Sequence, residues 1–166
     1  MKGKRSWGGA RIGAGRPTTR TRASEPHTAR PAIDAHQPVH VTARIVDALA
    51  DATSARTRLA IERALHRALD RSLDRVDFRI VQLGHRGASV VLIVEARDRL
   101  ALARGMQGFQ VSAARYLNAA TRRRGPVFPD RYRAAALTTR RAVRHALARA
   151  RWLVRYTPES RLLRGP

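Results

Sequence analysis

The chain has 166 residues, which is enough for one domain with a hydrophobic core and a further segment. It contains no cysteine, which excludes a disulfide framework and a thiolate zinc site, and no apolar run of roughly 18 residues that would span a membrane. The 34 Lys and Arg residues against 12 Asp and Glu residues give a formal net charge of +22, which favours a polyanionic partner. Nucleic acid is favoured over anionic membrane because no leucine and aromatic stripe accompanies the arginines.

The basic start of the chain lacks the apolar segment of a secretory signal, so we expect a soluble, cytoplasmic protein. Positive charge is distributed unevenly: the net charge is +6 over residues 1–40, +2 over 41–96 and +14 over 97–166. The middle segment has the charge balance of an ordinary folded protein. The last segment is the candidate surface for binding a polyanion.

Residues 1–35 are rich in Gly, Pro, Thr and Arg and predict a flexible, disordered basic arm. Within this arm, Gly-Ala-Gly-Arg-Pro at 13–17 resembles the core of a minor-groove hook, in which an arginine reaches the groove floor. Arg16 is therefore a candidate nucleic-acid contact, and a solvated tail is the alternative. We expect a single domain over 36–157 and a C-terminal tail over 158–166.

The first half of the domain contains three predicted strands and a helix. Val39, Val41 and Ala43 alternate with polar residues and predict a strand over 38–46. Phe78 and Ile80 share one face of a second strand, and the apolar run 90–94 predicts a central strand covered on both faces. A Gly-bounded connection at 84–87 predicts a hairpin between these two. An amphipathic helix over 54–73 is predicted by apolar residues three and four apart, namely Ile61, Ala64, Leu65, Ala68, Leu69 and Leu73, with Arg63, Arg67, Asp70 and Asp74 on its wet side.

The second half contains two predicted helices and an edge strand. Asp98 is a candidate cap of a helix that ends at Arg122–Pro126, with the apolar stripe Leu102, Met106, Phe109, Ala113, Leu117 and Ala120. Gly105 and Gly108 indicate either close packing or a break in this helix. Residues 127–137 predict an edge strand, since edges tolerate Pro129. Thr138 or Thr139 caps the last helix, with Val143, Ala146, Leu147, Ala150 and Val154 inward.

The element order is strand, helix, strand, strand, helix, strand, helix. Right-handed crossovers fold such an order into an α+β domain, a ferredoxin-like antiparallel sheet with helices on one face.

Several segments resemble one known family. His-x-Pro-Val-His-Val-Thr at 36–42, Leu-Ile-Val-Glu-Ala at 92–96, Ala-Leu-Ala-Arg-Gly-Met-Gln-Gly at 101–108, Val-Phe-x-Asp-Arg-Tyr at 127–132 and Ala-Leu-Ala at 146–148 resemble the REP-associated tyrosine transposases. These belong to the HUH-type single-tyrosine transposases. The resemblance covers about residues 36–150 and implies the same fold.

The resemblance also implies a chemistry: two histidines on the central strand hold a divalent metal ion, and a tyrosine on the last helix attacks a phosphodiester of single-stranded DNA. In this chain the histidine positions are Ser89 and Val91, and the tyrosine position is Arg149. Valine has no lone pair to offer a metal, and a guanidinium stays cationic and is no nucleophile. We therefore expect no catalytic residue and no cofactor, in a DNA-binding member of the family that has lost its cutting site.

The chain keeps many basic residues although it lacks the expected metal ligands and tyrosine nucleophile. The candidate nucleic-acid contacts precede a turn, flank an edge-strand tyrosine, or lie in the first turns of the last helix: Arg122, Arg123, Arg124, Arg131, Tyr132, Arg133, Arg140, Arg141 and Arg144. Tyr132 could stack on a base or pack in the core. A solvated helix face is the alternative for the arginines, but mutual repulsion among so few acidic neighbours argues against it.

The expected partner is single-stranded or hairpin DNA, bound through residues 122–151 and the arm. One alternative is an active DNA strand transferase with a rearranged site. An alternative of another class is a structural RNA-binding protein, which arginine-rich arms also suit. An unselected gene product that folds without a function is a further possibility.

Overall fold

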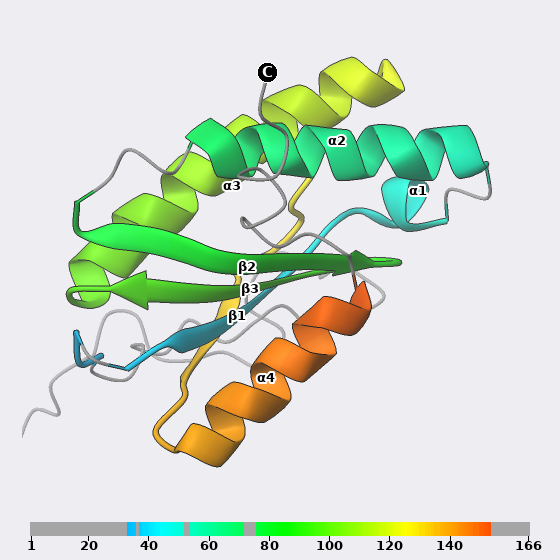
Figure 1. Ribbon diagram of the computed structural model, residues 1–166. Helices are drawn as coiled ribbons and strands as arrows, with labels where there is room; N and C mark the ends of the chain where they lie inside the picture. Colours follow the sequence, from blue (N-terminus) through cyan, green and yellow to red (C-terminus); the bar gives the residue numbers. More distant parts are fainter. Residues whose placement is uncertain (1–32, 36, 52–53, 72–75, 154–166) are drawn as a thin grey trace, which may run out of the picture.

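The computed structural model describes residues 33–35, 37–51, 54–71 and 76–153. Four strands form one sheet: β1 (Val39–Arg44), β2 (Phe78–Arg86), β3 (Ser89–Ala96) and β4 (Arg133–Ala136). Their order across the sheet is β2-β3-β1-β4, and each neighbouring pair is antiparallel (Figure 1). The α+β class and the ferredoxin-like antiparallel sheet predicted from the sequence are therefore confirmed.

The helices are α1 (Asp47–Ala50), α2 (Ala55–Arg71), α3 (Arg99–Thr121) and α4 (Arg140–Leu153). As expected, α2 and α3 lie side by side over one face of the sheet, but α4 packs on the opposite face (Figure 1). The reason lies in β3, which is apolar on both sides. Leu92 and Val94 face the core under α2 and α3, whereas Ile93 points the other way and is covered by α4.

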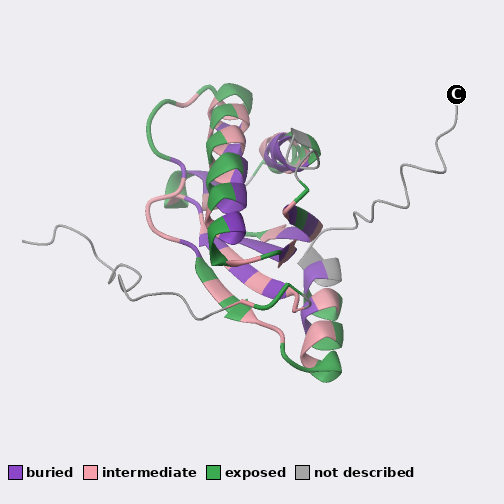
Figure 2. Cartoon of the chain, turned by 90° about the vertical axis from the view of Figure 1, so that its left-hand side faces the viewer, coloured by how far each residue is buried: buried purple, intermediate pink, exposed green. Residues whose placement is uncertain are grey.

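The main core lies between the sheet and the pair α2 and α3, and Figure 2 shows buried residues along the inner sides of the helices with exposed residues outside. A second, smaller cluster under α4 is formed by Ile93, Ala146 and Ala150, with Val81, Leu137 and Leu147 beside them. A β-bulge between Ile80 and Gln82 lets β2 contribute side chains to both clusters. The extra residue, Val81, joins the small cluster, while Leu83 returns to the main core.

Helix α3 begins and ends at recognisable signals. The carboxylate of Asp98 accepts a hydrogen bond from the backbone N–H of Ala101 at 2.8 Å, which confirms the predicted cap. The helix is unbroken through Gly105 and Gly108. A Cβ at Gly105 would overlap the ring of Phe78, so close packing explains that glycine, whereas Gly108 faces open space. The predicted apolar stripe is buried as far as Leu117, but Ala120 is exposed.

The predicted edge strand over 127–137 is shorter in the structure, where β4 holds only Arg133–Ala136. Val127 and Tyr132 are buried in the main core, outside the strand. Pro126 and Pro129 have no backbone N–H, so this stretch cannot form a continuous ladder. The carbonyl of Val127 instead accepts a hydrogen bond from the N–H of Val46.

Several predictions fall outside the described residues: the arm up to residue 32 with Arg16, the ends of two helices at Leu73, Asp74 and Val154, and the tail. The division into arm, domain and tail stays a prediction. Ile33 packs against the main core. In the described part of the chain, no helix is both long and apolar enough to cross a membrane.

Candidate nucleic-acid interface

Helix α4 combines a small apolar side with a basic outer side. The hydroxyl of Thr139 accepts a hydrogen bond from the N–H of Ala142 at 3.1 Å, so the second of the two threonines caps the helix. Ala146 and Ala150 pack on Ile93 of β3. Because this contact occupies one narrow side of the helix, the long polar side chains extend from the rest of it.

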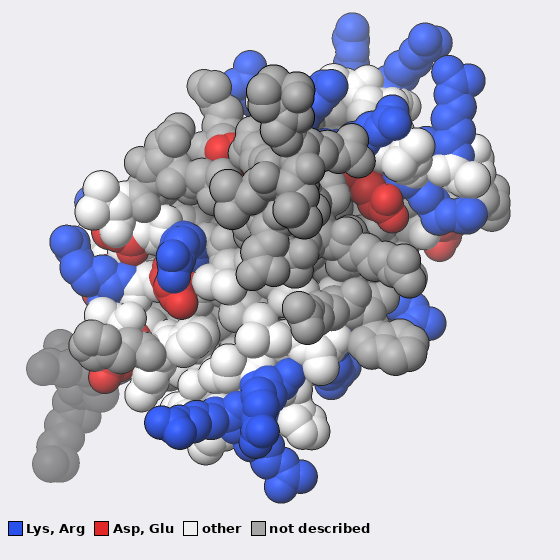
Figure 3. All heavy atoms as spheres, in the orientation of Figure 1, with Lys and Arg blue, Asp and Glu red and all other residues white. Residues whose placement is uncertain are grey.

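Among the described side chains of α4, four arginines are exposed: Arg140, Arg141, Arg144 and Arg149. The sequence of the helix contains no Asp or Glu, and none of the ion pairs within residues 33–35, 37–51, 54–71 and 76–153 involves these four side chains. Figure 3 shows the resulting group of basic side chains at the lower edge of the molecule, over α4. This surface has uncompensated positive charge and attracts polyanions.

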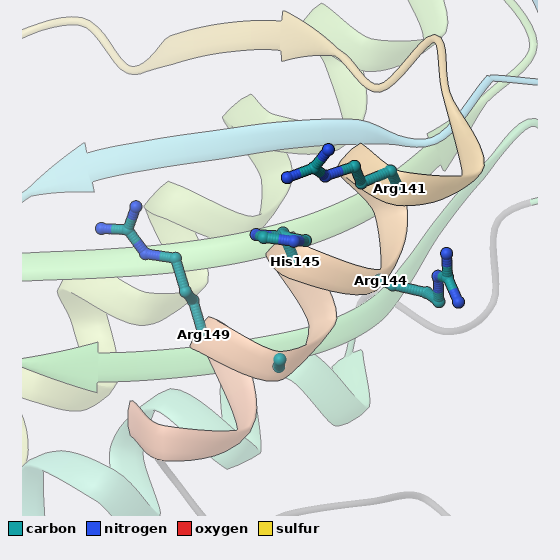
Figure 4. Close-up of a pocket in the computed structure, with 5 residues that line it drawn as sticks. Arg141, Arg144, His145 and Arg149 are labelled. Atoms are coloured by element: carbon teal, nitrogen blue, oxygen red, sulfur yellow. The ribbon is translucent and has the colours of Figure 1, made fainter.

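A cavity of about 620 Å³ runs along this helix and is lined by Arg141, Arg144, His145, Ala148 and Arg149. In Figure 4, Arg141, His145 and Arg149 extend to the same side of α4, and Arg144 extends to the other side. The four-residue spacing of the first three explains their alignment, since residues i and i+4 share a helix face. These three residues form the α4 stripe. The lining contains no carboxylate, so the cavity suits an anion.

His40 of β1 lies next to the α4 stripe. It pairs in register with Ile93, which places it on the face of the sheet that α4 covers. Partial burial lowers the pKa of His40 below its ordinary value, and the positive charge of Arg149 lowers this pKa further. The imidazole is therefore neutral at pH 7 and adds a hydrogen-bonding group without charge beside the arginines.

Ser89, Val91 and Arg149, the three positions at which the resemblance implied metal ligands and a nucleophile, belong to elements on the same side of the sheet. Ser89 and Val91 alternate with Ile93 along β3 and thus share the face on which α4, with Arg149, packs. Val91 is 9% exposed. One hydroxyl and one isopropyl group do not fit a divalent cation, which needs several oxygen or nitrogen ligands. Nor do three or more His, Cys, Asp or Glu side chains gather at one point among the described residues.

The predicted contacts around β4 have different surroundings. Tyr132 is 8% exposed and belongs to the main core, so its ring packs and presents no open face for a base. Arg131 is half-buried. Arg133 is exposed and pairs with Thr42 of β1, which places it on the same face of the sheet as His40.

Arg122, Arg123 and Arg124 follow the end of α3 and are separated from α4 by the sheet (Figure 1). Arg122 adopts a left-handed conformation, φ 54°, and its N–H caps the helix by bonding to the carbonyls of Ala119 and Asn118. Arg122 and Arg124 are exposed, and Arg123 is half-buried. The structure therefore divides the predicted contacts into two groups on opposite sides of the sheet.

Sequence reasoning did not include His40, His145 and Arg149 among the binding residues. The spacing of Arg141, His145 and Arg149 was the available signal for the α4 stripe. No pattern in the sequence connects His40 with Arg149, because more than one hundred residues separate them and only the fold brings them together.

No protein-family profile matches the chain, and no curated protein matches its sequence. A REP-associated tyrosine transposase bound to a REP hairpin shares its fold, with a TM-score of 0.53 and 11% identity over 78% of this chain and 70% of that chain. A protein from Deinococcus radiodurans R1, provisionally assigned as a transposase, has a TM-score of 0.46 and 10% identity over 76% and 94%. A C-terminal segment of the α subunit of aIF2 from Pyrococcus abyssi has a TM-score of 0.41 and 14% identity over 66% and 52%.

Proposed function

We propose that this protein binds single-stranded or hairpin DNA through α4 and no longer cuts it. One observation carries the proposal: α4 exposes four arginines and has no carboxylate of its own. Guanidinium groups bind phosphate oxygens in bidentate fashion, and phosphate contacts gain free energy by releasing counterions from DNA. The likeness in fold to a transposase bound to a hairpin supports DNA as the polyanion.

The neighbourhood of α4 suits a phosphate backbone. Arg140 and Arg141 lie in its first turn, where free backbone N–H groups also favour anions. Arg133 is exposed on the same side of the sheet and extends the basic surface from α4 to β4. A strand following the α4 stripe would meet Arg141, then His145, then Arg149, over a length of about 12 Å at 1.5 Å per residue.

The proposed loss of DNA cutting follows from the side chains of Ser89, Val91 and Arg149, which stand where the resemblance implies metal ligands and a nucleophile. Cutting by this family's route needs an attacking phenol and a cation that neutralises the phosphodiester. Arg149 supplies positive charge but cannot attack phosphorus, and Val91 supplies no ligand. In this proposal Arg149 converts the nucleophile's position into a phosphate-binding one.

Binding is tested by fluorescence anisotropy with a labelled DNA hairpin and a labelled single strand over a range of salt concentrations. Replacing Arg141, Arg144 and Arg149 by glutamine should reduce the slope of log K against log salt by about 2 to 3, since each phosphate contact contributes about 0.7 to 0.9. The matched control replaces Arg97, Arg99 and Arg104 by glutamine; these residues are exposed, lie at or in α3, and do not line the α4 cavity. Equal losses in both triple variants would show that α4 is not the interface.

Cutting is tested separately. The protein is incubated with single-stranded DNA and Mg²⁺ or Mn²⁺, and products are separated under denaturing conditions. We expect neither nicked strands nor a covalent protein–DNA adduct. An adduct on any tyrosine would instead establish an active strand transferase. Competition by structured RNA at fixed salt tests the RNA-binding alternative, because an RNA-binding protein prefers RNA to a DNA hairpin of equal length.

A further inference from the structure

A second basic cavity lies between α2 and α3, on the opposite side of the sheet from α4. Its volume is about 450 Å³, and its lining includes Arg56, Arg63 and Arg67 of α2 together with Leu59 and Tyr116. The other lining residues are alanines of the two helices. Figure 3 shows a second group of basic side chains at the upper right of the molecule, over the neighbouring ends of α2 and α3. We call this feature the α2–α3 groove.

The charge in the α2–α3 groove is uncompensated by its own lining. Arg56, Arg63 and Arg67 are all exposed, and no carboxylate lines the cavity. The negative charge of Glu62, on the same helix, partly offsets the lowering of the pKa of His66 and of His85 in β2. Asp70 is exposed three residues after Arg67, and neither Glu62 nor Asp70 lines the cavity, so the charged side chains of the lining itself are all positive. At 1.5 Å per residue, Arg56 and Arg63 lie about 10 Å apart along the helix axis, and Arg63 and Arg67 about 6 Å apart.

The groove also presents apolar groups in a fixed position. Tyr116 is half-buried and packs against the main core, so its ring cannot swing freely. Leu59 is 45% exposed, although it is a large apolar residue in an otherwise polar region of α2. Proteins that bind single-stranded nucleic acid combine an aromatic ring, on which a base stacks, with cationic side chains that bind the phosphates. A fixed ring beside arginines is such an arrangement.

We propose that the α2–α3 groove is a second nucleic-acid site that binds a single strand, stacking a base on Tyr116 against Leu59 and holding the flanking phosphates with Arg56, Arg63 and Arg67. The cavity volume is in the range of small-ligand sites, about 300 to 1,000 Å³, which suits one or two nucleotides rather than a protein helix. Arg122 and Arg124 follow the end of α3 and extend the same surface.

Two sites on opposite sides of the sheet make the protein bivalent. One molecule then holds two segments of nucleic acid, or two parts of one strand, and the linked contacts strengthen each other. The groove as a site goes beyond the proposed function, which needs α4 alone, whereas bivalency rests on the proposed function because α4 supplies the other site.

The test is a co-capture experiment. A biotinylated single-stranded oligodeoxynucleotide is immobilised, protein is bound to it, and the retention of a second, fluorescent oligonucleotide is measured. The groove variant replaces Arg56, Arg63 and Arg67 by glutamine, and the control again replaces Arg97, Arg99 and Arg104, which do not line the groove. We expect the wild type and the control to retain the second strand, and the groove variant to lose at least about tenfold of this signal while still binding the first strand.

Tyr116 gives a second, charge-neutral test. Tyr116→Phe keeps the ring and should keep co-capture, whereas Tyr116→Leu keeps most of the core packing and should weaken capture of the second strand about tenfold. Thermal melting of both variants controls for folding. Equal co-capture by Tyr116→Leu, Tyr116→Phe and the wild type would overturn base stacking in the groove.

The outcomes separate this inference from the proposed function. Undiminished co-capture by the groove variant overturns the inference and leaves α4 binding intact. Loss of binding to the immobilised strand by the groove variant, together with unchanged binding by the α4 variant, would support the groove as a site and show that α4 is not an interface. Displacement of the second strand by polyglutamate as effectively as by unlabelled oligonucleotide would mean that the groove recognises any polyanion, and would also overturn the inference.

Discussion

Gly105 and Gly108 lie three residues apart in α3, yet the structure requires only one of them. A Cβ at Gly105 would overlap the ring of Phe78 from β2, because helix and sheet approach each other closely there. A Cβ added at Gly108 would have no neighbouring atom within 4 Å. A glycine in a helix interior is otherwise unfavourable, since it loses more backbone entropy than alanine does on folding.

Alanine at the two glycines should therefore have opposite effects. We expect Gly105→Ala to lower the free energy of unfolding by about 1 to 3 kcal/mol through overpacking against Phe78. Gly108→Ala should raise it by up to about 1 kcal/mol. Urea unfolding followed by circular dichroism measures both. A stabilised Gly105→Ala protein would show that α3 does not approach the sheet at this point.

His40 reports on the position of Arg149. Burial and the Arg149 charge both lower the pKa of the imidazole. Arg149→Gln removes the second cause, so the pKa of His40 should rise but stay below its ordinary value. NMR titration of the histidine ring measures this. Arg144→Gln is the control, since Arg144 extends to the other side of the helix from Arg149 (Figure 4), and should leave the pKa of His40 unchanged.

The lowered histidine pKa values determine how the stability of the protein depends on pH. The pKa values of His40, His66 and His85 are all lowered in the folded protein, in each case chiefly by burial. Protons thus bind more tightly to the unfolded chain, and the stability present above the ordinary histidine pKa is lost as the pH falls through the lowered values. We expect the melting temperature to decrease on acidification from pH 7 toward pH 5. A melting temperature that rises over this interval would contradict the burial of these rings.

At the scale of elements, α4 is attached to the sheet by a small cluster. Among the side chains that the structure describes, only Ile93, Ala146 and Ala150 are buried there, whereas α2 and α3 share the main core. Gln82 pairs in register with Ile93 and is 6% exposed. Its Nε2 has no hydrogen-bond partner within the described part of the chain. A buried donor without a partner costs about 1 to 3 kcal/mol, so α4 is the less stably attached helix.

Hydrogen exchange should show this difference. Backbone amides of α4 are expected to exchange faster than those in the middle of α3, and Gln82→Met should slow the exchange of α4 by replacing the amide with an apolar side chain of similar length. Gln107→Met, at an exposed position of α3, is the matched control. Equal exchange in α3 and α4 would show that the small cluster holds its helix as firmly as the main core does.

At the scale of the whole molecule, self-repulsion is the consequence of a net charge of +22. The ion pairs Arg44–Asp47, Arg79–Glu95 and Arg97–Asp98 are at the surface and contribute little stability. The folded state brings the many arginines closer together than the unfolded chain does, and salt screens their repulsion.

Added salt should therefore stabilise the protein. We expect the melting temperature to rise as NaCl is increased from about 20 mM to about 200 mM, where the screening length falls below about 10 Å. A short polyphosphate should give the same increase at a far lower concentration, because it binds the folded state. A melting temperature that falls with salt would show that attractive ion pairs outweigh the repulsion.

Local signals in the sequence were sufficient for most elements. Asp98 and Thr139 cap their helices as predicted, and the four- and three-residue spacing of Leu102, Met106 and Phe109 identified the core face of α3 correctly. Such signals depend on neighbouring residues along the chain, so one sequence suffices to detect them. The start of the predicted edge strand was wrong because strand pairing depends on hydrogen bonds to β1, which the prolines before β4 prevent.

The sequence by itself determined the basic character of this protein, its α+β class and the residue types at Ser89, Val91 and Arg149. Only the tertiary structure decided that α4 lies on its own face of the sheet, that His40 lies near Arg149, and that α2 and α3 enclose a second basic groove. The physical reason is that each of these features joins residues from different elements. Their proximity is set by how helices pack on a twisted sheet, and no spacing along the chain encodes it.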